Sequence, residues 1–353
     1  MATNILYRPM TEADGPAFAG LSFSAADAGR VAYTANYLID AYRAVQVIHG
    51  DMSGVVATTP DQQRVLGVGL VRYGRCQFEG EVRPFALLNN LIVHPDYRGR
   101  GIAAGIENWR LQNVRERLGE NAVLLANFQR GNEYPRKTAG AWIKQTIGPT
   151  RYVLHKVRPS RERLQPPPMP GLTVRHAREH EYAVFAGALN NFYGSTNLFI
   201  PETAASLKED LARTPFDSPV RHIRVAVDED GQLLAGMVVL EEYRLKTLEV
   251  RNMPAPLKLA NRFFQVVPAD GILREVYMDR VWYRIRQEEA ARYLIESVRW
   301  EWQEKANLAT VLIDPKGPLK ELFPFKMWNS MEGFVGVGGP VAIRGDRAFC
   351  PIY

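Results

Sequence analysis

A short basic loop between an apolar run and a helical stretch constrains this chain more than any other feature. Residues 85–93 form the apolar run, which predicts a buried strand, and residues 102–118 have a pattern that predicts a helix. Residues 98–101 between them read Arg-Gly-Arg-Gly. A helix N-terminus attracts anions through its unpaired N–H groups and its dipole, and glycines let a ligand approach the backbone closely. The sequence therefore predicts an anion-binding turn at this point.

This loop resembles motif A of the GCN5-related N-acetyltransferases (GNAT), in which an Arg or Gln precedes a Gly and then a Gly or Ala at fixed spacing. Arg98, Gly101 and Ala103 occupy those positions. In that family the loop wraps the pyrophosphate of acetyl-coenzyme A, and the preceding strand lies beside the pantetheine arm. The resemblance implies acetyl-CoA or another acyl-CoA as co-substrate, and no metal. The cofactor-binding residues that it implies are Ile92, Val93, Arg98, Gly99, Arg100, Gly101, Ile102, Ala103 and Asn132.

Length and composition limit the class of protein. A chain of 353 residues exceeds one ordinary hydrophobic core, which predicts two domains. No apolar run approaches the roughly 20 residues that span a bilayer, and the start shows no leader pattern, so we expect a cytoplasmic protein without a membrane partner. Cys76 and Cys350 are too few for a disulfide framework or a metal site. The net charge of +6 comes without a Lys/Arg block, so no nucleic-acid partner is expected.

The organisation of the chain repeats on either side of a proline-rich segment, residues 159–170. Arg8 is followed ten residues later by Phe-Ala-Gly, and Arg175 is followed by the same three residues at the same spacing. An insertion at about residues 245–271 lengthens the second copy. Beyond it, the alignment of the following strands places Glu289 where the first copy has Gly101. A carboxylate there satisfies the helix dipole and repels phosphate, so we expect the second copy to have lost the anion site.

The resemblance implies an α/β (α+β) fold with two tandem GNAT-like domains, each a twisted, mixed and mostly antiparallel sheet flanked by helices. Residues 1–158 are expected to form the acyl-CoA-binding catalytic domain, and residues 171–353 a degenerate copy, with residues 159–170 as the linker. Tandem members with one degenerate copy are known in the family. A homodimer is left open.

Acyl transfer to an amine requires a proton acceptor for the amine and a polarised thioester carbonyl. Asn89 interrupts the predicted strand at a position where many family members carry a Glu that relays the proton. An amide cannot ionise, so the acceptor must come from elsewhere in the chain or from a water chain. A purely structural Asn89 is the alternative. His94 is predicted to lie on the surface or to pin the loop.

The family's general acid toward the thiolate is a Tyr four residues before a Gly, and Arg136 stands there in this chain, ahead of Gly140. Tyr134 is the nearest substitute, and a packing role is its alternative. In one tandem group of the family the terminal carboxylate lies in the active site of the first copy, and the same is a hypothesis for Tyr353. The predicted catalytic residues are therefore Tyr134 and Asn89.

The predicted function is an N-acetyltransferase that moves an acetyl or other acyl group from acyl-CoA directly to an amine of a small-molecule or peptide acceptor. A non-catalytic acyl-CoA sensor or interaction module is the alternative, which the absent Glu and the displaced Tyr favour. A nucleotide- or RNA-binding loop that clamps phosphate is a second alternative.

Overall fold

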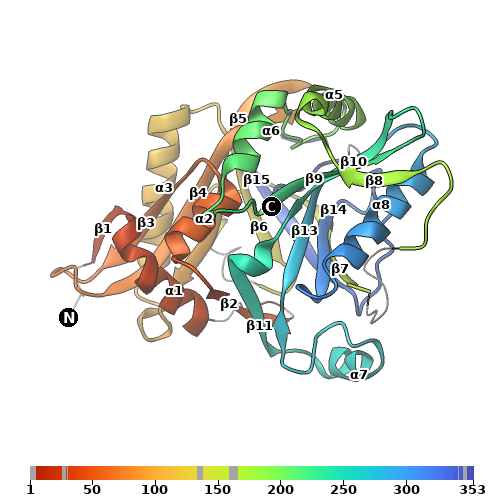
Figure 1. Cartoon of the computed structure of the whole chain (residues 1–353). Helices are drawn as coiled ribbons and strands as arrows, with labels where there is room; N and C mark the ends of the chain where they lie inside the picture. Colours follow the sequence, from red (N-terminus) through yellow and green to blue (C-terminus); the bar gives the residue numbers. More distant parts are fainter. Residues whose placement is uncertain are drawn as a thin grey trace.

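The computed structural model describes residues 5–25, 29, 31–132, 138–158, 166–340, 342–344 and 348–353. The strands of both halves form one continuous twisted sheet across the molecule, with helices on both faces (Figure 1). The elements of the N-terminal half are β1 (Leu6–Pro9), α1 (Gly15–Ser24), β2 (Ala32–Tyr37), α2 (Ala41–His49), β3 (Met52–Thr58), β4 (Val65–Phe78), β5 (Glu81–Val93), α3 (Ile102–Leu118), β6 (Val123–Gln129) and β7 (Gln145–Lys156). The elements of the C-terminal half are β8 (Thr173–His176), α5 (Tyr182–Phe192), α6 (Ala204–Ala212), β9 (Arg221–Val227), β10 (Leu233–Leu240), β11 (Lys246–Asn252), α7 (Ala255–Phe264), β12 (Ile272–Leu273), β13 (Glu275–Tyr283), α8 (Glu288–Glu301), β14 (Leu308–Ile313) and β15 (Ser330–Gly338).

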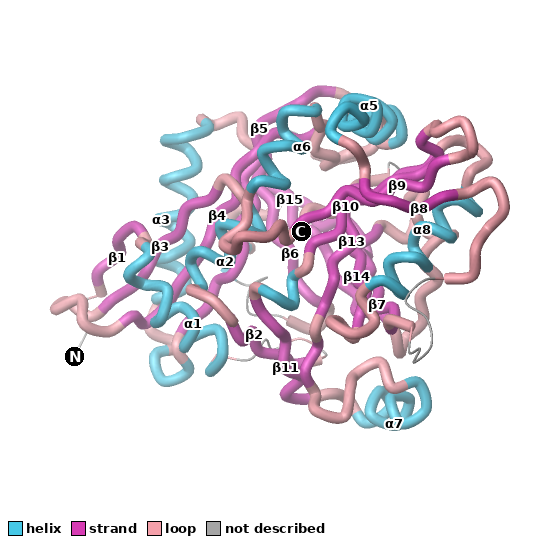
Figure 2. Tube along the Cα trace, viewed as in Figure 1, coloured by secondary structure: helices cyan, strands magenta, loops and turns pink. Residues whose placement is uncertain are grey.

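The main sheet has 12 strands in the order β1-β3-β4-β5-β6-β15-β7-β14-β13-β10-β9-β8. Its described strand pairs are antiparallel except β5–β6 and β13–β14, which are parallel. A second, three-stranded sheet has the order β12-β11-β2. Figure 2 shows the strands running from one side of the molecule to the other. This mixed, mostly antiparallel architecture confirms the predicted fold class.

The two halves are joined by an exchange of their last strands. β15, which ends the second half, lies between β6 and β7, and β7 of the first half pairs with β14. The small sheet joins the halves again, because β2 pairs with β11 of the insertion. The predicted boundaries of the domains along the sequence stay a prediction, since the halves share one sheet in space.

The first turn of each half confirms the internal repeat. The guanidinium of Arg8 donates two hydrogen bonds to the carboxylate of Asp14, at 2.8 and 2.7 Å. The guanidinium of Arg175 binds Glu181 in the same bidentate way, at 2.7 and 2.6 Å. Each carboxylate also caps the backbone at the start of its short helix, through Thr11 in the first half and Arg178 in the second. The same local design therefore begins both copies.

Candidate active site

The strands that flank the predicted loop diverge. β5 and β6 pair over three residues only, from Phe85 opposite Val123 to Leu87 opposite Leu125. Beyond this point β6 continues to pair with β15 on its other edge. β5 changes there from buried residues to the half-buried residues 89–93. Beyond Leu87 the β6-facing edge of β5 therefore pairs with no described strand, and we call the space between the diverging strands the opening.

A β-bulge lies where this opening begins. Asn90 has φ +48°, and two residues of β5, Asn90 and Leu91, face the single Gly69 of β4. Gly69 is required there because a Cβ would lie 2.5 Å from the side chain of Ile106 on α3. Asn is among the residues that best tolerate positive φ. The bulge bends β5 out of its regular pairing with β4, close to the point where β5 and β6 separate. We call this point the fork.

A buried guanidinium from α3 fixes the bulge. Arg110 donates to the carbonyl oxygens of Asn89 and Leu70, at 3.0 and 3.1 Å. Arg110 also pairs with Glu107 on the same helix, and Glu107 accepts a hydrogen bond from the indole of Trp142. Burial lowers the pKa of Arg110, while Glu107 counteracts that effect. The sequence contained a signal for this ion pair, because Glu107 and Arg110 are three residues apart on the buried face of a predicted helix.

The hydrogen bonds between β4 and β5 determine which backbone N–H groups of β5 point into the opening. The N–H of His94 donates to the carbonyl of Leu66 on β4, at 2.9 Å. Because successive N–H groups of a strand alternate in direction, the amide of Val93 points into the opening and that of Ile92 points toward β4. Val93 thus has the geometry of a main-chain donor to a ligand between the strands. The binding roles of both residues stay predictions.

The basic loop leaves room for a ligand against its backbone. Gly99 and Gly101 have φ values of +77° and +80°, and a Cβ at either position would meet no other atom within 4 Å. Gly101 is the N-cap of α3, so the amides of Ile102 and Ala103 belong to its first turn. The side chain of Ile102 is buried and can contribute its backbone only.

Cations surround this loop. The side chains of Arg98 and Arg100 each donate to a backbone carbonyl of the loop region, at 3.3 Å. Arg64, from the turn before β4, donates to the Tyr97 hydroxyl at 3.1 Å, and both Arg64 and Arg100 lie over the Tyr97 ring. Sequence reasoning missed Arg64, because only the folded β3–β4 hairpin brings it to the loop. His94 accepts a hydrogen bond from the Asp96 backbone, which fits its predicted pinning role.

The remaining predicted residues lie beyond β6. Asn132 follows the end of β6, and its backbone N–H donates to the carbonyl of Gln129 at 3.1 Å. Tyr134 lies outside the described residues, so its role as an acid stays a prediction.

Asn89 contacts a histidine that sequence reasoning did not select. The amide nitrogen of Asn89 lies 3.5 Å from Nε2 of His49, at the end of α2. Burial, followed by the charges of Arg72 and Lys246, holds the pKa of His49 well below its usual value, so the ring is neutral at pH 7. The amide oxygen of Asn89 is buried and has no hydrogen-bond partner among the described residues. This oxygen and a neutral imidazole therefore lie together beside the fork.

The final segment of the chain lies beside the same site. Arg72 of β4 donates to the backbone oxygen of Tyr353 at 2.6 Å, and Asn127 of β6 donates to the carbonyl of Ile352 at 2.6 Å. The Tyr353 hydroxyl donates to Glu242 at 2.7 Å. Segments nearly 300 residues apart thus meet at the centre of the molecule, where Figure 1 marks the C-terminus.

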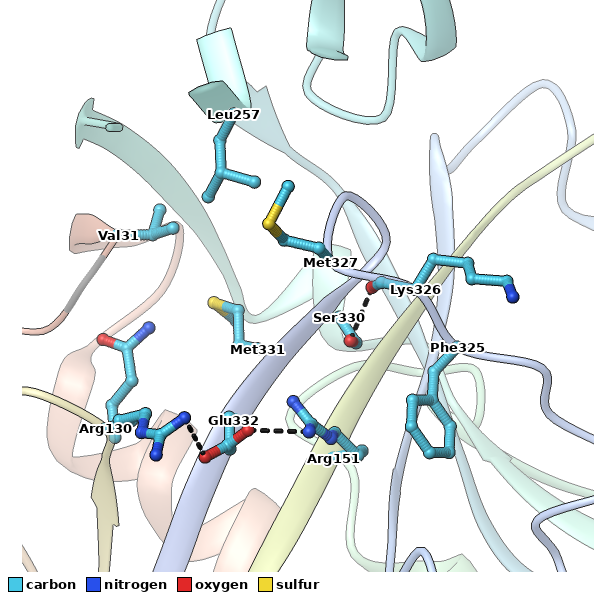
Figure 3. A pocket seen from close by; sticks show the side chains of 11 residues that line it. Val31, Arg130, Arg151, Leu257, Phe325, Lys326, Met327, Ser330, Met331 and Glu332 are labelled. Atoms are coloured by element: carbon cyan, nitrogen blue, oxygen red, sulfur yellow. Dashed lines mark hydrogen bonds and ion pairs between the residues drawn. The ribbon is translucent and has the colours of Figure 1, made fainter. Parts of the chain in front are cut away.

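A cavity of about 330 Å³ opens where β6 ends and β15 begins (Figure 3). Glu332 is held between Arg130 and Arg151, at 2.9 and 2.7 Å. The other walls of the cavity are largely apolar and come from both halves of the chain. They include Val31, Leu257, Phe325, Met327 and Met331.

The corresponding opening of the second half is closed. Its bulge is at Arg280, with φ +51°, opposite Met237 of β10. A cavity of about 30 Å³ lies between β13 and β14, and the chain's own residues 349–351 form part of its wall. The N–H of Phe349 donates to Asp314 at 3.1 Å, which anchors this segment at the end of β14.

The helix that follows the closed opening begins with acidic residues. α8 has Gln287 as its N-cap and Glu288 and Glu289 in its first turn. The helix starts therefore align Gly101 with Gln287 rather than with Glu289, two positions from the alignment made on sequence. The conclusion is unchanged, since carboxylates occupy the positive end of this helix dipole.

The structure has a GNAT-like fold in two tandem copies: each half contains a diverging parallel strand pair with a bulge beside it, and the first half alone has a glycine-rich helix N-terminus. No protein-family model matches the sequence, and no curated protein matches it. The structure is similar to Saccharomyces cerevisiae N-myristoyltransferase with bound myristoyl-CoA (TM-score 0.65, 11% identity, 96% of this chain and 80% of that chain). It is also similar to a GCN5-related N-acetyltransferase from Sphaerobacter thermophilus (TM-score 0.59, 15% identity, 97% and 98% of the two chains).

Two further findings concern the described residues alone. None of their helices combines the length and the hydropathy that crossing a bilayer requires. They also contain no group of three or more His, Cys, Asp or Glu side chains placed to hold a metal ion.

Proposed function

We propose that the first half of this chain transfers an acyl group, acetyl in the first instance, from acyl-CoA to an amine. The observation that carries the proposal is the opening between β5 and β6, which ends at the loop of residues 98–101. The amides around residues 99–103 would hold the diphosphate, with Arg64, Arg98 and Arg100 supplying positive charge. The amide of Val93 would bind the pantetheine arm or the thioester carbonyl. Asn132 and Tyr134 keep their predicted roles.

The chemistry follows from the groups at the fork. The amine attacks the thioester carbon, a backbone N–H stabilises the oxyanion, and the C–S bond breaks to release the coenzyme A thiolate. The unpartnered amide oxygen of Asn89 would accept a hydrogen bond from the amine and orient it. The neutral ring of His49 would hold the Asn89 amide in place, and the amine's excess proton would pass to a water chain, because the lowered pKa of His49 makes the ring a poor proton acceptor. This assignment answers the absence of a Glu at position 89 without requiring Asn89 to ionise.

The structural neighbours, an N-myristoyltransferase with bound myristoyl-CoA and a GCN5-related N-acetyltransferase, support acyl transfer as the reaction class. They leave the acyl length and the acceptor undecided. Small-molecule amines and peptide N-termini are the acceptor classes proposed here. A non-catalytic acyl-CoA sensor is the second candidate, favoured by the departures from the family pattern at Asn89 and Arg136.

Calorimetry and thiol release test the proposal together. The chain should bind one acyl-CoA, and a panel of amines should accelerate release of the coenzyme A thiol. Asn89→Ala should lower kcat at least tenfold with an unchanged acyl-CoA Kd, whereas Gly101→Glu should weaken binding. Binding without any acceptor-dependent release would support the sensor, and no binding at all would refute both candidates.

A further inference from the structure

The insertion of the second half builds a helix that stands away from the body of the molecule. The first half joins β4 to β5 by the turn at residues 79–80, whereas the second half places β11, α7 and β12 between β10 and β13. Figures 1 and 2 show α7 projecting below the sheet. Leu257 is the only fully buried residue of α7. The helix therefore presents most of its surface to the surroundings.

The exposed surface of α7 is apolar. Leu259 and Phe263 are one turn apart on the helix, and the Phe263 side chain is 77% exposed. Phe264 stacks on Trp328 of a neighbouring loop, with 4.5 Å between ring centroids and 3° between ring planes. Soluble proteins rarely expose a contiguous cluster of large apolar groups without a use for it. We call Leu259, Phe263, Phe264, Met327 and Trp328 the α7 patch; all five are among the exposed large apolar residues.

Positive charge borders the α7 patch. Residues 253–268 contain Lys258 and Arg262 and no Asp or Glu, and residues 322–331 contain Lys326 and no Asp or Glu. The side chains of these three cations are exposed and form no ion pair within the described residues. Lys258 and Arg262 are one turn apart on α7, next to Leu259. The projecting surface thus combines large apolar side chains with unpaired cations.

We propose that the α7 patch docks this protein on an anionic lipid bilayer. A helix with aromatic and Leu side chains on one side and Lys and Arg beside them is suited to the boundary between lipid headgroups and acyl chains. The patch contains five side chains, fewer than the roughly 20 residues a side of a stable protein interface. The unpaired cations match anionic headgroups. The absence of a membrane-spanning stretch, which led us to expect no membrane partner, does not bear on a helix that lies on the surface.

Docking in this way would bring the cavity of Figure 3 to the lipid. Leu257, Lys326 and Met327 line that cavity, and they belong to the same two segments as the α7 patch. A lipophilic molecule in the bilayer would then reach the cavity without crossing water. This consequence is additional to the docking itself, which does not depend on the proposed transferase activity.

Vesicle binding tests the apolar part of the proposal. The full chain should co-sediment with vesicles of phosphatidylcholine and phosphatidylglycerol, and Leu259→Ser with Phe263→Ser should weaken this binding at least tenfold. Both residues are exposed, so the variant should keep the unfolding temperature of the parent protein. Ile285→Ser is the matched control, because Ile285 is a 90% exposed apolar residue outside the patch, and it should bind as the parent protein does.

Charge removal tests the electrostatic part. Lys258→Gln with Arg262→Gln should weaken binding to the anionic vesicles about tenfold at low salt. Lys316→Gln with Lys320→Gln removes the same charge elsewhere in the second half and should have little effect. The proposal is overturned if the parent protein ignores anionic vesicles, if it binds pure phosphatidylcholine equally well, or if the patch variant binds like its control. Self-association through the patch without vesicle binding would also overturn it.

Discussion

The two halves of this chain contain the same fork between parallel strands, and only one fork is open. In the first half the β6-facing edge of β5 has no strand partner beyond Leu87 within the described part of the chain, and the loop before α3 contains glycine and arginine. In the second half residues 349–351 fill the equivalent space, and α8 begins with two glutamates. Both halves therefore keep the sheet and the bulge, whether or not the space between the strands is filled. On the proposed function, a few residues at one helix start and one packed segment decide which half binds the acyl-CoA.

The bulges show the same difference in another form. Asn90 sits at a half-exposed fork and leaves its neighbour Asn89 with an unpartnered oxygen. Arg280 at the equivalent position binds Asp210, at 2.6 Å, and also pairs with Glu202 and Asp279. A buried polar group without a hydrogen-bond partner can bind a ligand, whereas the ion pairs of Arg280 stabilise the fold.

Residues 349–351 occupy the space between β13 and β14, and a substitution there tests whether this segment alone prevents acyl-CoA binding in the second half. Phe349→Ala should destabilise the chain by about 3 kcal/mol, because it leaves a cavity in the core. It should not create a second cofactor site, since the acidic start of α8 stays in place. Urea denaturation measures the first effect, and calorimetric stoichiometry measures the second. Two bound acyl-CoA molecules per chain would contradict our account of α8.

Alanine at the two bulges should separate a structural bulge from a functional one. Arg280→Ala should cost about 3 kcal/mol of unfolding free energy, because it leaves buried carboxylates with fewer partners. Asn90→Ala should cost about 1 kcal/mol, which reflects the positive φ alone. Equal losses of unfolding free energy in denaturant titrations would show that the two bulges contribute equally to stability.

Carboxylates in the first turn of α3 should convert the open site toward the closed one. Ala103→Glu with Ala104→Glu should weaken acyl-CoA binding on the order of 10- to 100-fold, through repulsion of the diphosphate. The helix itself should not be destabilised, because acidic groups suit its N-terminus. The matched control is Ala103→Gln with Ala104→Gln, which keeps side-chain size without charge. Calorimetry with acyl-CoA would show the difference.

A buried carboxyl between the halves should make stability depend on pH. Burial, and then the charge of Glu242, raise the pKa of Glu275 to about 8. The folded chain therefore holds a proton that the unfolded chain has lost, so stability should fall as pH rises from about 4.5 to about 8. Glu275→Gln keeps the neutral form, so relative to the parent protein it should gain on the order of 1 kcal/mol for each pH unit between pH 5 and pH 8. Urea midpoints at both pH values check this, and parallel curves for the two proteins would refute it.

The smallest effect is expected from the cation that the hairpin adds to the loop. Arg64→Ala should weaken acyl-CoA binding about fivefold, because an exposed charge near a phosphate contributes about 1 kcal/mol. The effect should shrink at high salt. Arg115→Ala at the other end of α3 is the control and should leave the affinity unchanged.

The loop predicted to bind an anion could be located from the sequence because its signals are local, and its binding role stays a prediction. The loop at residues 98–101 needs only its own glycines and the helix that follows, and the structure places Gly101 at the N-cap. The repeat was readable from Arg8 and Arg175, whose ion pairs lie within six residues. His49 and Arg110 were not selected, because their partners lie 40 and 21 residues away on other elements.

The sequence by itself determined the class of fold, the internal repeat and the half that has the glycine-rich helix start, because the signals for each are residues close together along the chain. Only the tertiary structure decided the exchange of β7 and β15, the closure of the second fork by residues 349–351 and the meeting of His49 with Asn89. The physical reason is that strand pairing and burial join distant segments, and one chain offers many such pairings of similar local quality. The packed core selects among them.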